Sequence, residues 1–302
     1  MNAPNFTELL PIRRRLARAR QINAQIRELC AQYVASKPAR LRTRDAGNDQ
    51  TDVVLQLTHE QPPVLAYMAG ESVHHVRAAL DNVVTMMAEH AHGGPLPSKA
   101  AKDVQFPIYR LPEAFDDAVQ GKRNPLVGLS SEVVAKIRDV QPFEHYAFAS
   151  GTKFPSSKHP LARLQALSNQ DKHRRVTVVS RAVESASVHF AEALGGPTVP
   201  HLFHPPYTDG ETLVRLTGRP PGIEVRPRIA VQLEIPPFET PEGEWTEAQN
   251  VDLPSALTIL VDQVEMAVLG HILGDDFAIH ASHDTPDLLL PSRGTQRILS
   301  SS

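Results

Sequence analysis

The stretch AGESVHHVRAALDNVVTMMAEHA, residues 69–91, is the most regular part of the chain and predicts a long helix. Its apolar residues recur at intervals of three and four positions, which places them on one face of a helix. They are Val73, Val76, Leu80, Val83 and Met87. The residues Gly93-Gly94-Pro95 follow this stripe and indicate where the helix stops. We therefore expect a core helix here.

Four further stretches have the periodicity of helices. The longest, residues 6–35, carries an apolar stripe that runs from Ile12 to Tyr33. A basic segment overlaps it, since residues 13–44 hold ten Lys or Arg and one acid, Glu28, which we interpret as a solvated helix face. A homo-oligomer formed through this N-terminal helix is one partner hypothesis. The other helices are predicted over 130–140, 159–174 and 254–273, with a turn or two of helix around 112–120.

Alternating and β-branched stretches predict strands. TDVVLQLTHE at 51–60 is one of them, and it follows a charged link at 37–51. The clearest is RIAVQLEI at 228–235, in which every second residue is apolar, as in a strand with one wet face. The remaining strands are predicted in VTVVSRAV at 176–183, ASVHF at 186–190 and TLVRLTG at 212–218.

These elements predict the α+β class, as a bundle of four or five helices packed with a mostly antiparallel sheet. Strands lie both before and after the central helices in the sequence. We therefore expect a single domain over residues 1–274, followed by a loose tail over residues 275–302 that has no periodicity.

Composition excludes several classes of protein. The 31 Lys and Arg residues against 34 Asp and Glu residues give a formal charge of −3, so no global charge favours nucleic acid or an anionic membrane. The single cysteine, Cys30, excludes an internal disulfide and a thiolate-rich zinc site. No stretch approaches the roughly 18 apolar residues of a membrane span. We expect a soluble cytoplasmic protein without a membrane partner.

Two clusters of polar residues lie at the edge of the predicted core. On the helix 69–91, His74, Arg77 and Asp81 share one face beside the apolar stripe. On the helix 159–174, Asp171 continues the apolar row of Leu164 and Leu167 and points the same way. The residues that surround Asp171 are Lys172, His173, Arg174 and Arg175.

Charges at a core edge are costly unless they are paired, so we expect these two clusters to meet. The simplest pairs are Arg77 with Asp171, and Asp81 with Arg174 or His173. We favour a structural ion-pair network in a binding or interaction protein. The same residues are the candidates for catalysis if the protein is an enzyme, namely His74, Arg77, Asp81, Asp171, His173 and Arg174.

Three chemical alternatives remain open. The first is a metal-independent ribonuclease of the HEPN kind, which needs an Arg and then a His on one helix, with four to six residues between them. Arg138 and His145 are the only match, and Pro142 lies between them. RNA would then be the partner, with His as general acid or base and Arg stabilising the developing phosphorane charge.

The second alternative is a metal site and the third is an anion pocket. Glu71 and His74 form one Glu-x-x-His pair at helical spacing, to which Asp171 and His173 could add ligands. A phosphorylated small molecule or a nucleotide could be held by cations of both clusters. Those cations are Arg77, Lys172, His173 and Arg174. No cofactor is predicted, because the glycine-rich phosphate loop and the dinucleotide fingerprint are missing.

At these residues the chain resembles a family of uncharacterised bacterial and phage-associated proteins. That family carries a segment like G-D/E-x-x-H-N-L-R-S-A-L-D-H-L, followed by FPI, Q-P-Y, H-P-L and N-x-D-K-H-R. Here His75 replaces the family's Asn, and Asn82 replaces its second His. The matching segments are GESVHHVRAALDNV at 70–83, FPI at 106–108, QPF at 141–143, HPL at 159–161 and NQDKHR at 169–174.

The resemblance implies no particular activity, because none is established for the family. It implies that the polar residues of the two helices, from His74 to Arg174, form one spatial site. Nucleic-acid binding stays a further hypothesis for that site.

Overall fold

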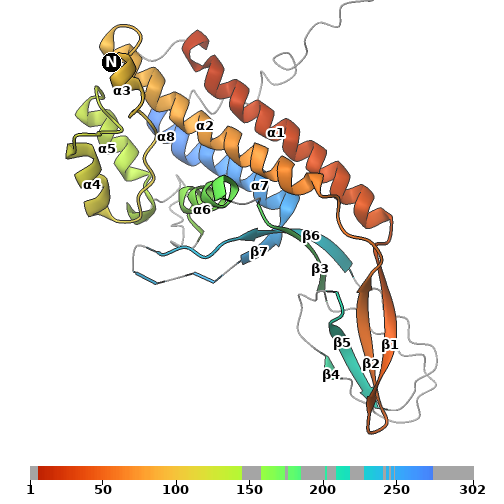
Figure 1. Cartoon of the computed structure of the whole chain (residues 1–302). Coiled ribbons are helices and arrows are strands. Elements are labelled where there is room, and N and C mark those ends of the chain that lie inside the picture. Colours follow the sequence, from red (N-terminus) through yellow and green to blue (C-terminus); the bar gives the residue numbers. More distant parts are fainter. Residues whose placement is uncertain are drawn as a thin grey trace, which may run out of the picture.

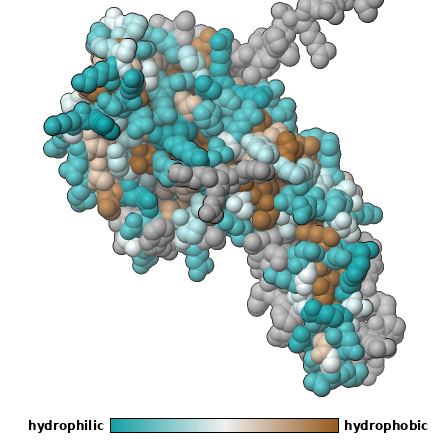
Figure 2. Space-filling view, viewed as in Figure 1, coloured by the Kyte–Doolittle hydropathy of each residue, from teal (hydrophilic) through white to brown (hydrophobic). Residues whose placement is uncertain are grey.

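A bundle of helices carries two small antiparallel sheets, and one sheet projects from the end of the bundle as an arm (Figure 1). The space-filling view in Figure 2 shows the arm as a narrow projection from a broader body. The predicted α+β class is confirmed. The structure is a computed structural model that describes residues 6–144, 158–173, 176–184, 201–202, 209–217, 228–240, 243–244, 246–247 and 249–274.

Two long antiparallel helices, α1 (Phe6–Ala35) and α2 (Val64–His92), form the spine of the bundle (Figure 1). The predicted stripes face each other. The chain leaves α2 at Gly93, whose φ of 76° lies in the left-handed region that suits glycine, as the stop signal predicts. The stripe residues that are at most 1% exposed include Ile12, Leu16, Ile22, Ile26, Val73, Val76, Leu80 and Val83.

A third helical run packs against both spine helices. It consists of α7 (Leu253–Gln263), the π-helical turn η3 (Val264–Leu269) and α8 (Gly270–Leu273). Asp252 caps its start by accepting the backbone N–H of Ser255 at 3.1 Å. The predicted helix over 254–273 is confirmed.

The same run corrects the expectation that no stretch approaches a membrane span. Residues Leu253–Leu273 are long and apolar enough to cross a membrane by length and composition, with a mean hydropathy of 1.5. A buried core helix meets the same criterion, and 56% of this window is buried inside the protein. Two of its carboxylates, Asp262 and Glu265, pair with Arg20 of α1, which fixes the run within the bundle.

Shorter helices close the side of the bundle. They are α3 (Ser98–Ala101), α4 (Pro112–Gln120), α5 (Ser131–Asp139), the 3₁₀ turn η1 (Pro142–Glu144) and α6 (Pro160–His173). The predictions for 112–120, 130–140 and 159–174 are confirmed to within one residue. Ser130 caps α5 as its sequence indicates, because the hydroxyl oxygen accepts the N–H of Val133.

The expected single sheet is divided into two. The arm contains β1 (Ala39–Gly47), β2 (Gln50–Leu57), β4 (His201–Leu202) and β5 (Thr212–Thr217) in the order β1-β2-β5-β4. The second sheet, with β6 in its centre, lies against the bundle in the order β3-β6-β7. Its strands are β3 (Val178–Glu184), β6 (Arg228–Ile235) and β7 (Gln249–Asp252).

The predicted charged link at 37–51 is wrong, because most of it forms β1. A tight turn at Asn48 and Asp49, both with positive φ, folds β1 back onto β2. Strand pairing therefore overrides the polar composition of β1, which lies at the edge of the arm where its charges stay in solvent.

One continuous core runs through the bundle and reaches the arm at Leu55 and Leu213. The apolar stripe of α1 is buried in that core. A homo-oligomer through α1 would need this stripe at its interface. The predictions for ASVHF at 186–190 and for the tail at 275–302 lie outside the described residues.

Candidate functional site

Arg77 and Asp81 hold the backbone of the FPIY segment, residues 106–109. Arg77 Nη2 donates to the carbonyl oxygen of Phe106 at 2.6 Å, and Asp81 Oδ1 accepts the N–H of the same residue at 2.9 Å. The two side chains lie 3.4 Å apart as an ion pair one helical turn apart on α2. The FPIY segment belongs to no helix or strand, and side chains of α2 hydrogen-bond with its backbone in place of a neighbouring strand.

Gln141 of the QPF segment completes this attachment from the other side. Its side chain is fully buried, accepts the N–H of Tyr109 at 2.9 Å and donates to the carbonyl of Pro107 at 3.0 Å. The amide also donates to Ile137 of α5. Three of the segments quoted for the resemblance, 70–83, 106–108 and 141–143, are therefore joined by hydrogen bonds.

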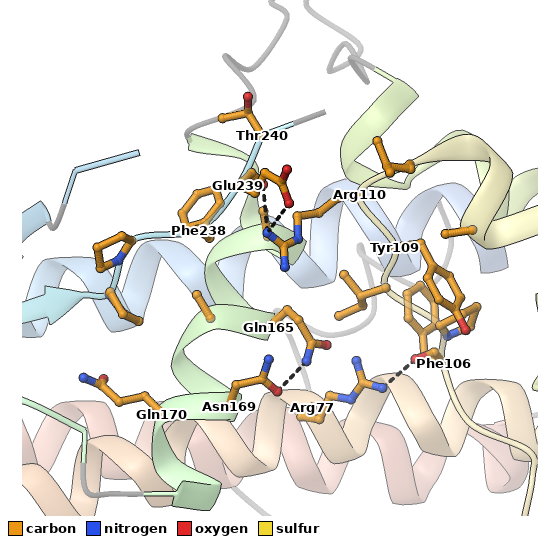
Figure 3. A pocket seen from close by; sticks show the side chains of 18 of the residues that line it. Arg77, Phe106, Tyr109, Arg110, Gln165, Asn169, Gln170, Phe238, Glu239 and Thr240 are labelled. Carbon is orange, nitrogen blue, oxygen red and sulfur yellow. Dashed lines mark hydrogen bonds and ion pairs between the residues drawn. The ribbon is translucent and has the colours of Figure 1, made fainter. Parts of the chain in front are cut away.

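The FPIY segment forms one wall of a cleft of about 830 Å³. Helix α6 forms the opposite wall, and the segment from Pro236 to Thr240, which follows β6, lies at one end (Figure 3). Arg77 lies at the foot of the cleft. Because α6 extends from HPL into NQDKHR, all five segments of the resemblance contribute to the cleft or support its wall.

The wall formed by α6 presents amide groups. Gln165 Nε2 donates to Asn169 Oδ1 at 2.7 Å, which leaves the amide nitrogen of Asn169 and the oxygen of Gln165 for other partners (Figure 3). Gln170 and Lys172 line the cleft on the same helix. Lys172 is exposed and has no ion-pair partner within the described part of the chain.

An ion pair bridges the cleft between its walls. Arg110 donates to the carbonyl oxygen of Glu239 at 3.2 Å and lies 3.8 Å from the carboxylate of that residue (Figure 3). Phe238 and Thr240 flank Glu239 and are both buried. The lining residues thus include three cations, Arg77, Arg110 and Lys172, and one carboxylate, Glu239.

Arg77 is the most constrained of the three cations. Its side chain is 16% exposed, and burial lowers the pKa of the guanidinium, while Asp81 partly counters that shift. Its Nη1 atom is buried and has no hydrogen-bond partner. A buried donor of a charged group without an acceptor costs on the order of 1–3 kcal/mol. An acceptor supplied by a ligand would remove that cost.

The predicted pair of Arg77 with Asp171 is wrong. Arg77 pairs with Asp81, one turn further along its own helix, and Asp171 packs instead against Gly70 of α2. Gly70 lies seven residues before Arg77, about 10 Å along the helix axis. A Cβ at Gly70 would clash with Asp171 Oδ1, so the absence of a side chain at Gly70 leaves room for the Asp171 carboxylate against α2.

The partners predicted for Asp81 lie beyond what the structure describes. His173 is the last residue of α6, and its side chain lies outside the described part, as does Arg174. The carboxylate of Asp81 accepts the N–H of Phe106 and pairs with Arg77. The site therefore keeps the two predicted helices and Arg77, but the FPIY segment lies between them as a third component.

The residues proposed for a metal site are separated into different contacts. Glu71 binds Arg18 of α1 at 2.8 Å, and His74 is exposed on the surface of α2 with its ring against that of His75. His75 Nδ1 accepts a hydrogen bond from Arg15 Nη1 at 3.2 Å, and burial, followed by the charge of Arg15, lowers the pKa of His75. Within the described ranges, no three His, Cys, Asp or Glu side chains group around a potential metal position.

The arrangement required by the HEPN hypothesis is not formed at Arg138. Helix α5 ends at Asp139, so Arg138 and His145 do not share a helix, and His145 lies outside the described residues. Arg138 pairs with Asp116 and Glu144, and its guanidinium lies 5.1 Å from the centre of the Phe143 ring. These contacts give Arg138 a structural role at the end of α5.

Several residues that line the cleft or hold its wall were missed by reasoning from the sequence. Gln141, Gln165 and Asn169 are neutral, and no ionisable pattern marks them. Gln141 and Asn169 do belong to the segments QPF and NQDKHR. The need for an amide at Gln141 follows only from its hydrogen bonds to the FPIY segment. Arg110, Phe238 and Glu239 reach the cleft from loops that had no predicted structure.

Comparisons of the chain with known protein families, curated proteins and solved structures find no match. Functional evidence for the protein therefore comes from the cleft and from the groups that line it.

Proposed function

We propose that the protein binds a small anionic molecule, with a phosphate or carboxylate group, in the cleft between α6 and the FPIY segment. The observation that carries the proposal is the charge of the described lining, in which Arg77 at the foot of the cleft, Arg110 and Lys172 outnumber the one carboxylate, Glu239. The volume of about 830 Å³ is that of a pocket for a small molecule.

The charge of the lining favours an anion. Three cations face one carboxylate, and Arg110 already occupies that carboxylate. Arg77 supplies a planar fork of donors, which matches a carboxylate or phosphate, and Lys172 supplies a mobile charge at the exposed part of the wall. The proposal thus keeps the anion pocket expected from the sequence, with Arg77 and Lys172 as its described cations.

The remaining lining groups favour recognition over catalysis. The described lining has no histidine, cysteine, aspartate or serine, and its one carboxylate, Glu239, is paired with Arg110. Amides on α6 offer donors and acceptors to a polar ligand body, and Tyr109 and Phe106 offer aromatic surface. Such a lining supports a binding protein, or the binding half of a protein that acts with a partner.

The test is thermal unfolding and titration calorimetry with inorganic phosphate and with AMP as probes, at a constant ionic strength set with KCl. A ligand at one hundred times its Kd stabilises the folded state by about 2.7 kcal/mol. For a chain of this size each kcal/mol raises Tm by roughly 2–4 °C. Lys172→Ala should weaken binding about tenfold, since a charged hydrogen bond contributes roughly 1.5 kcal/mol.

Matched variants separate binding from stability. Lys172 is exposed and has no described partner, so Lys172→Ala should leave the Tm of the free protein unchanged. Asn169→Asp keeps the shape of the wall and places a negative charge in the cleft, so it should also weaken binding. Lys99→Ala, an exposed lysine on α3 outside the cleft, should behave as wild type. If neither probe binds, or if all three variants bind equally, the proposal fails.

A further inference from the structure

The arm has a face on which arginines are aligned. Arg40, Arg42 and Arg44 alternate along β1, so their side chains lie on one side of the sheet. The strand register continues this face across the arm, because Arg44 lies opposite Asp52 of β2, and Asp52 lies opposite Arg215 of β5. We call Arg40, Arg42, Arg44 and Arg215 the arginine face.

Asp52 is the one carboxylate within this face, and it fixes two of the arginines. It accepts from Arg215 Nε at 2.6 Å and Nη2 at 3.1 Å, and from Arg44 Nη2 at 3.0 Å. Asp52 is 1% exposed, whereas the side chains of Arg44 and Arg215 are 60% and 41% exposed. The two guanidinium groups are thus held rigidly and keep a net positive charge in solvent.

The other two arginines add charge that no carboxylate balances. Arg40 donates to the neutral amide of Gln56, and within the described part of the chain Arg42 has no hydrogen-bond or ion-pair partner. The remaining carboxylates of the arm lie in turns or alternate to the other side of the sheet. They are Asp45 and Asp209, which accept the backbone N–H groups of Gly47 and Leu57, together with Asp49 and Glu211.

The basic segment 13–44 is therefore divided by the fold into two parts. On α1, three arginines have polar partners on neighbouring helices: Arg15 contacts His75, Arg18 binds Glu71, and Arg20 binds Asp262 and Glu265. Arg14 and Arg27 are exposed, so α1 keeps part of the solvated basic face that the sequence predicts. On β1, the arginines lie at the surface of a projecting sheet (Figure 1).

We propose that the arginine face binds the phosphate backbone of a nucleic acid. Arginines two residues apart on a strand repeat about every 6.6–6.8 Å, which suits a ligand with regularly repeated anions. Guanidinium groups bind phosphate through two parallel hydrogen bonds. The arm projects from the body (Figure 1), and β1 lies at its edge, so an extended polyanion can approach the arginine face.

The surface favours a nucleic acid over a membrane. Proteins that bind membrane surfaces combine basic residues with apolar side chains that insert into the lipid. None of the large exposed apolar side chains among the described residues lies on β1, β2 or β5; they are Val34, Val64, Tyr67, Leu111, Val127, Ile259 and Met266. Protection of an edge strand from aggregation is the structural alternative for charges on β1.

The experiment is fluorescence anisotropy of the full chain with a short labelled DNA duplex and an RNA of the same sequence, at several KCl concentrations. Contacts of three arginines with phosphates predict a slope of log K against log salt of about −2.7, or about a 40-fold loss of affinity between 50 and 200 mM. The double variant Arg40→Gln/Arg42→Gln should reduce that slope by about 1.8. Its Tm should stay close to wild type, because neither arginine forms an ion pair.

The control is Arg14→Gln/Lys99→Gln, which removes the same charge from exposed positions on the helical body. An equal loss of slope in both double variants would mean binding by net charge alone and would overturn the proposal. So would binding to vesicles of phosphatidylcholine and phosphatidylserine without binding to either nucleic acid. If Arg40→Gln/Arg42→Gln aggregates while its anisotropy with nucleic acid stays as in wild type, the arginines protect the edge strand β1 and do not bind nucleic acid. Lys172→Ala should not change the anisotropy, since the arm and the cleft are separate.

Discussion

Replacement of Gln141 by methionine is expected to destabilise the protein, because Gln141 attaches the FPIY segment to the bundle. Methionine has a similar length but cannot accept from Tyr109 N–H or donate to the carbonyl of Pro107, which Gln141 does at 2.9 and 3.0 Å. A backbone group left without a partner costs about 1–3 kcal/mol. Tyr109 is only partly buried, so the lower half of that range applies to each group.

The expected loss for Gln141→Met is therefore about 2–4 kcal/mol in the free energy of unfolding. Urea denaturation followed by circular dichroism measures it, and an unchanged slope with urea would show that the unfolded state is not affected. Gln105→Met is the matched control, since Gln105 lines the same cleft but is exposed, and its effect should stay within about 0.5 kcal/mol.

A loss below about 1 kcal/mol for Gln141→Met, or equal losses for the two variants, would refute this account of the FPIY segment. The same substitution bears on the cleft. Because the FPIY segment is one wall of the cleft, its release should weaken binding of a ligand even though Gln141 does not line the cleft. Titration of the variant with the probe that binds wild type measures that second effect.

The remaining predictions concern three other parts of the protein. Arg77→Met and Asp81→Asn should each lower the free energy of unfolding in urea, and the double variant should differ from the sum of the two losses by about 0.5–3 kcal/mol. The reason is that both side chains hold the backbone of Phe106. Additive losses would exclude a joint action. The guanidinium of Arg215 lowers the pKa of Asp52 from 3.8 to about 2, so the stabilisation is complete above pH 3.8 and is lost as the pH falls toward 2. A series of Tm values against pH should show this loss in wild type and not in Asp52→Asn. Burial raises the pKa of Cys30 to about 12, so a thiol reagent at neutral pH should label the protein only after unfolding; rapid labelling of the folded protein would contradict that burial.

Residues close together in the sequence account for what could be predicted of the fold. Helix α2 follows from the spacing of Val73 to Met87, and its end follows from Gly93, because helical periodicity and capping depend on neighbours within a few positions. The cap at Ser130 and the start of α7 at Asp252 are of the same kind. The strand β1 was missed because its partner β2, and not its own polar sequence, determines its conformation.

The candidate site was predicted only in part, for a related reason. The sequence placed Arg77 and Asp81 on one helix face and indicated that charges at a core edge must be paired. It could not choose the partner, since Asp171 and Asp81 both offer a carboxylate to Arg77. The choice depends on where α6 packs on α2, which brings Asp171 against Gly70 and leaves Asp81 as the carboxylate beside Arg77.

The sequence by itself determined the helices, their caps and the residues that line the helical core, because these depend on local spacing and on burial of apolar side chains. The tertiary structure alone decided that the FPIY segment lies between the two polar helices, held by Arg77, Asp81 and Gln141. It also decided that the arginines of β1 lie on a projecting arm, while Arg18 and Arg20 of α1 pair with carboxylates of neighbouring helices. Hydrogen bonds and ion pairs between distant segments depend on positions in space, which helical and strand periodicity do not specify.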